Sequence, residues 1–109
     1  MTDRELLELA AKAAGWESWD WLEDDALNVY AKDGRHDVFE PLTDDGDALR
    51  LAVKLRLIVA WDRWNDNDYV CIRHRDLDEE IGIQIDQSQE QTVRRAIVLA
   101  AAEIGRAME

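Results

Sequence analysis

The sequence is short of cysteine, of proline and of long apolar runs. Cys71 is the only cysteine among 109 residues, so no internal disulfide can form, as is usual in a reducing compartment. The longest unbroken apolar run, Ala96 to Ala102, is far shorter than the ~20 residues that cross a bilayer. The first residues also lack the basic and apolar regions of a secretory signal. We therefore expect a cytoplasmic protein without a membrane-spanning segment.

Basic residues are scarce as well, and the net charge is −12. Residues 1–47 carry fourteen acidic and four basic residues, whereas residues 48–109 carry eleven acidic and nine basic residues. An acidic surface repels phosphate backbones and attracts basic proteins. We therefore expect no direct nucleic-acid binding and a partner with a basic surface. The alternative is that the acidity serves only solubility.

The chain length predicts a single domain, residues 1–109, with no repeat and no linker. Three helices are predicted over residues 3–14, 44–56 and 89–107, each from a cap ahead of an amphipathic segment. The capping residues are Thr2 with Glu5, Thr43 or Asp44, and Ser88 with Gln91. The last helix has more apolar residues than one face can hold. Either the first helix or a second subunit should cover it, so a homodimer through residues 96–108 is possible.

Alternating apolar and polar residues predict strands over residues 27–31, 37–40, 57–61, 69–75 and 81–85. Residues 17–25 show no clear period and are expected to be irregular or a short strand, and residues 62–68 a polar loop. The order α-β-β-α-β-β-β-α predicts an α+β fold, in which an antiparallel sheet of about four to five strands packs against three helices in a sandwich-like arrangement. The residues expected to share one core are Val53, Ile58, Ile72, Ile83, Ile97 and Ile104.

Candidate metal and catalytic motifs fail on spacing. The aspartates of residues 62–68 suggest a calcium loop, but the glycine needed at its sixth position is missing, and Arg73 stands where the bidentate glutamate should be. Cys71 and His74 should point to opposite faces of their strand, which argues against zinc binding together with His36 and against a Cys-His nucleophile. We expect no cofactor, no metal and no catalytic residue.

Five tryptophans stand in or beside polar segments, and tryptophan is enriched in the energetic centres of protein interfaces. Trp16 and Trp61 are expected to cover core edges. The other three are equally consistent with core edges and with exposed binding side chains. Together with the acids around them they form the predicted protein-binding residues, which are Trp19, Asp20, Trp21, Glu23, Asp24, Asp25, Trp64, Asp66 and Asp68.

Two segments carry a family resemblance. The first, Phe39–Leu55, joins a Phe-x-Pro-Leu-Thr-Asp-Asp-Gly-Asp-Ala helix start to an amphipathic helix. The second runs from Arg94-Arg95-Ala96-Ile97 to Met108. In these motifs, and in element order over nearly the whole chain, the sequence resembles the phage ABA sandwich domain family of small phage and prophage proteins. The resemblance implies a sandwich fold and a place in the bacterial host cytoplasm, and it brings no catalytic residues.

These observations lead to three function hypotheses. The favoured one is a non-catalytic phage or prophage accessory protein that binds a host or phage protein through an acidic, tryptophan-containing surface. A sharper alternative is an inhibitor of a host nucleic-acid-handling defence system, such as a CRISPR complex, which mimics DNA with its carboxylates. A second alternative is a structural or self-assembling phage protein. A small metal-dependent enzyme is the least favoured class.

Overall fold

The computed structural model describes residues 1–86 and 88–108. In chain order its elements are α1 (Asp3–Ala13), β1 (Ser18–Glu23), β2 (Ala26–Tyr30), β3 (His36–Phe39), α2 (Asp45–Leu55), β4 (Ile58–Trp64), β5 (Asn67–Arg73), β6 (Ile81–Gln84) and α3 (Gln89–Ala107). The α+β class and the order of helices and strands are confirmed. The helix caps are also as predicted, because Thr2 and Glu5 form a capping box, Asp44 accepts from the Asp47 N–H, and Ser88 accepts from the Gln91 N–H.

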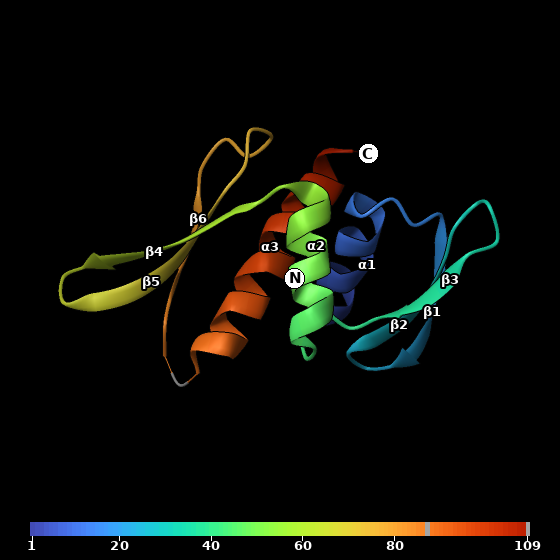
Figure 1. The fold of residues 1–109 in the computed structure, drawn as a ribbon, viewed down its shortest axis with the longest axis horizontal. Helices are drawn as coiled ribbons and strands as arrows, with labels where there is room; N and C mark the ends of the chain where they lie inside the picture. The colour runs from blue at the N-terminus through green and yellow to red at the C-terminus, as the bar shows by residue number, and fades with distance from the viewer. Residues whose placement is uncertain (87, 109) are drawn as a thin grey trace.

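The strands form two antiparallel sheets rather than the single sheet predicted, in the orders β1-β2-β3 and β4-β5-β6. Figure 1 shows the three helices as a middle layer, with one sheet at each end of the molecule. The sixth strand is β1, because residues expected to be irregular or a short strand pair with β2 from Ser18 to Glu23. The reason for two sheets is α3, which is buried on more than one side and packs against both α1 and the second sheet.

The apolar segment Ala96–Ala102 is covered within the monomer. α1 packs along α3, and the helices approach so closely at Gly105 that a Cβ there would lie 2.0 Å from the Leu9 carbonyl oxygen. Of the two alternatives for covering this segment, the first helix is therefore the one observed. The homodimer through residues 96–108 loses its basis, because Ala96, Val98 and Ala101 are fully buried.

The predicted core is wrong at Val53 and Ile58. Val53 is 68% exposed and Ile58 57% exposed, while Leu51 faces the core. α2 contains two overlapping stripes of helical spacing, and periodicity alone does not choose between them. The structure selects the stripe that contains Ala48, Leu51 and Ala52. Ile58 begins β4 on the outer face of its sheet, opposite Arg73.

The predicted loop over residues 62–68 is wrong, because β4 and β5 pair as far as Trp64 and Asn67. The turn consists of two residues, Asn65 and Asp66, with φ of 52° and 63°. Two successive left-handed residues characterise a type I′ turn, whose twist matches that of a two-stranded hairpin. Asn-Asp is a weaker signal for this turn than Asn-Gly. The strand ends on either side of it are mostly polar, so their sequence did not indicate that they pair.

Candidate functional site

Trp19 and Trp21 point from β1 towards α1. The Trp19 indole N–H donates to Glu8 Oε2 at 3.1 Å, and the Arg4 guanidinium lies 4.5 Å from the centre of the Trp21 ring. Both indoles are partly buried against the core. They join α1 to the first sheet, so they are not two fully exposed anchors on an open surface.

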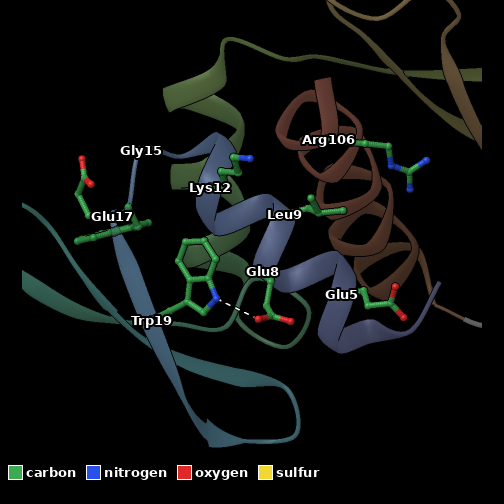
Figure 2. A pocket seen from close by; sticks show the side chains of 9 residues that line it. Glu5, Glu8, Leu9, Lys12, Gly15, Glu17, Trp19 and Arg106 are labelled. Carbon is green, nitrogen blue, oxygen red and sulfur yellow. Dashed lines mark hydrogen bonds between the residues drawn. The ribbon is translucent and has the colours of Figure 1, made fainter. Parts of the chain in front are cut away.

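A groove of about 840 Å³ lies between α1, the start of β1 and the end of α3. Two indoles line it, those of Trp16 and Trp19, together with three carboxylates from Glu5, Glu8 and Glu17. Two cationic side chains, Lys12 and Arg106, complete the lining with Leu9 and Gly15. Figure 2 shows Trp19 and Glu8 turned towards each other across this groove, with Glu17 at one end and Arg106 at the other. We call it the α1–β1 groove.

The end of α1 places Trp16 in the groove. Gly15 has φ of +91°, in the left-handed region that glycine adopts without strain. The Gly15 N–H donates to the Lys12 carbonyl and the Trp16 N–H to the Ala11 carbonyl, which closes the helix and turns the chain back along it. The predicted helix stop at Gly15 and the predicted packing of Trp16 against a core edge are therefore confirmed.

Glu5 is held in its charged form at the other end of the groove. Its carboxylate accepts from the Thr2 backbone N–H at 3.3 Å and from the Thr2 hydroxyl at 3.0 Å. These hydrogen bonds, with a smaller contribution from Arg106, lower the pKa of Glu5. Arg106 also pairs with Glu103, at 3.4 Å, which lies outside the groove lining.

The predicted acidic residues of β1 separate into two groups. Asp20 lies on the outer face of the sheet, where it accepts from the Asn28 amide and the Tyr30 hydroxyl, each at 3.0 Å. The hydrogen bond that the Tyr30 hydroxyl donates to Asp20 raises the pKa of Tyr30. Asp20 therefore faces away from the two tryptophans next to it in the chain.

The other group lies at the β1–β2 turn, where Glu23 ends β1 and Asp24 and Asp25 form the turn. Asp24 pairs with Arg4 at 3.3 Å. The fold brings the turn near the acidic start of α2, and the pKa of Glu40 is raised by burial and by Asp47, Asp44, Asp25 and Glu23 around it. Sequence reasoning missed this meeting of carboxylates, because Glu40 and the turn are fifteen or more residues apart.

The remaining predicted residues, Trp64, Asp66 and Asp68, belong to the β4–β5 hairpin. Trp64 is 67% exposed, and Trp61, expected to cover a core edge, is 57% exposed. Figure 1 shows this hairpin and β1 at opposite ends of a molecule whose longest dimension is 47 Å. The predicted binding residues therefore lie at two opposite ends of the molecule and do not form one surface.

Cys71 and His74 have structural surroundings. The Asp76 N–H donates to His74 Nδ1 at 3.0 Å, so the ring proton is on Nε2, which donates to the Leu55 carbonyl at the end of α2 at 2.8 Å. Burial raises the pKa of the Cys71 thiol, and Glu80 and Asp62 add to the effect. Within residues 1–86 and 88–108, no three His, Cys, Asp or Glu side chains are placed to hold a metal ion.

We predict that Cys71 reacts slowly with thiol reagents in the native protein. The thiol is 3% exposed and its pKa is raised, so both access and thiolate population are low. At pH 8 its reaction with a disulfide reagent should be at least ~10-fold slower than in denaturant, because burial limits both the access of the reagent and the population of the reactive thiolate. Equal rates in the two states would place Cys71 at the surface.

Comparison with protein-family models, with curated proteins and with solved structures finds no match to this chain. No helix of the described residues has both the length and the apolar character to cross a membrane.

Proposed function

We propose that the protein is a non-catalytic module that binds a basic segment of a partner protein in the α1–β1 groove. The observation that carries this proposal is the pairing of two indoles, Trp16 and Trp19, with three carboxylates in one open groove. Indole faces attract lysine and arginine cations, and carboxylates accept their hydrogen bonds. A single basic side chain can use both kinds of contact at once.

The Trp19–Glu8 hydrogen bond supports this function. It fixes the edge of the indole beside the Glu8 carboxylate. An arginine that stacks on an indole can reach a neighbouring carboxylate with its planar fork of N–H donors. We therefore expect arginine to bind at least as well as lysine.

The charge of the molecule supports the choice of partner. The net charge of −12 and the acidic β1–β2 turn should steer a basic segment towards this end of the protein. The resemblance to phage and prophage proteins makes a host or phage protein in the bacterial cytoplasm the proposed source of the segment.

A second candidate, a DNA mimic that inhibits a host defence nuclease or CRISPR complex, is favoured by one observation. Carboxylates from the β1–β2 turn and from α2 gather around Glu40. A DNA mimic occupies a nucleic-acid channel, so DNA should displace the protein from its partner. If DNA does not displace the protein from its partner, the DNA-mimic candidate is excluded and the groove proposal remains.

The proposal predicts selective binding of basic peptides. On an array of arginine- and lysine-containing peptides, binding should exceed that of the same peptides with glutamine at the basic position. For the best peptide, Trp16→Ala should weaken binding by about tenfold or more, since it removes a cation–π contact. Glu17→Gln should weaken binding several-fold and reduce its salt dependence, because exposed charges are screened over ~8 Å at physiological ionic strength.

Two matched controls test the location. Trp64→Ala removes a more exposed indole, and Asp66→Asn removes a carboxylate, both at the opposite end of the molecule. Both should leave peptide affinity unchanged. If glutamine peptides bind equally well, or if only the controls weaken binding, the α1–β1 groove is not the binding site.

A further inference from the structure

Within the described residues, the two sheets have four edge strands, and β4 differs from the other three. β3 and β6 have four residues each, which limits what can pair with them. β1 has a break in register between Trp21 and Glu23, and it is followed by the acidic turn. Short length, bulges and charge are the usual means by which proteins prevent edge-to-edge pairing.

β4 lacks the first two of these protections, and its charged residues are one acid and one base. It has seven residues and pairs with β5 without any break in register. Its sequence Ile-Val-Ala-Trp-Asp-Arg-Trp contains no proline or lysine, and its single acid is followed by a single base. Five of its seven residues are exposed, among them Ile58, Trp61 and Trp64. A long, apolar and open edge of this kind is a template for another strand.

The segment around β4 carries less net charge than the acidic front of the chain. Residues 48–64, which include most of α2 and all of β4, carry four basic residues and one acidic residue, a net charge of +3. Residues 1–47 carry four basic and fourteen acidic residues, a net charge of −10. A two-fold contact through residues 48–64 therefore brings fewer like charges together than one through the acidic front of the chain.

We propose that β4 pairs with β4 of a second copy in an antiparallel, two-fold symmetric dimer. The pairing centred on Trp61 uses all seven residues, with Trp61 opposite Trp61 and Ile58 opposite Trp64. Cross-strand aromatic pairs and aromatic–β-branched pairs are among the stabilising contacts of sheets. Centring on Asp62 instead places two like charges directly opposite each other, which is unfavourable.

The dimer joins the two β4-β5-β6 sheets into one continuous sheet. An apolar groove of about 460 Å³ lies beside β4, lined by Trp61 and Val59 together with Leu49 of α2 and Val93 of α3. Trp61 belongs both to this groove and to the centre of the pairing. The α1–β1 groove is at the other end of the molecule, so both copies keep it open (Figure 1).

Sedimentation velocity from about 1 to 100 µM tests the dimer, a range that covers weak and moderate self-association. As the concentration rises, the average mass of the wild-type protein should increase from 12.6 kDa towards twice that value. Trp61→Lys puts two ammonium groups opposite each other and should remain monomeric throughout. Leu22→Lys is the matched control, because Leu22 is 52% exposed on the other long edge strand, and it should dimerise like the wild type.

Hydrogen exchange on the wild type gives a second readout that needs no variant. Amides of residues 58–64 should exchange at least ~10-fold more slowly at high than at low protein concentration, while those of β1 should not change. A wild-type protein that stays at 12.6 kDa over the whole range overturns the proposal. So does a dimer that Trp61→Lys leaves intact.

Discussion

Replacing Gly105 with alanine should destabilise the protein by roughly 3 kcal/mol, although the same change inside an exposed helix stabilises by up to ~1 kcal/mol. The sign reverses because the new methyl group would lie 2.0 Å from the carbonyl oxygen and 2.8 Å from the carbonyl carbon of Leu9. These atoms belong to the α1 backbone, which cannot rotate away as a side chain can. Relief requires the two helices to separate, and their contact buries Ala10, Val98 and Ala101.

Thermal unfolding of the two proteins measures this effect. For a domain of about this size, 3 kcal/mol corresponds to a fall in Tm of roughly 12 °C or more. Gly82→Ala is the matched control, because nothing lies within 4 Å of a Cβ at that position, and it should leave Tm within a few degrees. If Gly105→Ala melts at or above the wild-type temperature, the close crossing of α1 and α3 is wrong.

Two aspartate substitutions two residues apart on α2 should have very different effects. Leu51→Asp puts an unpaired carboxylate into the core and should cost roughly 4 kcal/mol, among the largest effects of single substitutions. Val53→Asp changes a side chain that is 68% exposed and should cost less than about 1 kcal/mol. The comparison is sharp because both variants introduce the same residue into the same helix.

Chemical denaturation at low protein concentration, where any dimer is dissociated, gives the two unfolding free energies. Similar values for the two variants would mean that α2 does not present one defined face to the core. A larger loss of unfolding free energy for Val53→Asp would mean that the predicted stripe, which contains Val53, faces the core.

The parts of the fold that could be predicted depend on contacts between residues close in sequence. A cap such as Ser88 is recognisable because its partner, the Gln91 N–H, is three residues away. The stop at Gly15 and the alternation of β5 and β6 are equally local. These signals were enough to predict the helices and most strands, and therefore the α+β class.

The rest depends on contacts between distant segments. The pattern of α2 fits two helix faces, and only the packing of this helix against the rest of the core selects Leu51 over Val53. The division into two sheets follows from α3 being covered on two sides. For the candidate site, the sequence identified Trp19 and the acids of β1, but not the approach of Glu8 to Trp19, since the two residues meet only when β1 packs beside α1.

The central claim is that a basic segment binds in the α1–β1 groove, and the indole N–H signals of the five tryptophans test it most directly. The ¹⁵N-labelled protein is titrated with the best arginine-containing peptide and followed by two-dimensional NMR. The account predicts saturable shifts of the Trp16 and Trp19 indole signals, which shrink as salt rises, and no shift at Trp61 or Trp64. Shifts confined to Trp61 and Trp64, or no indole shift at peptide saturation, would contradict it.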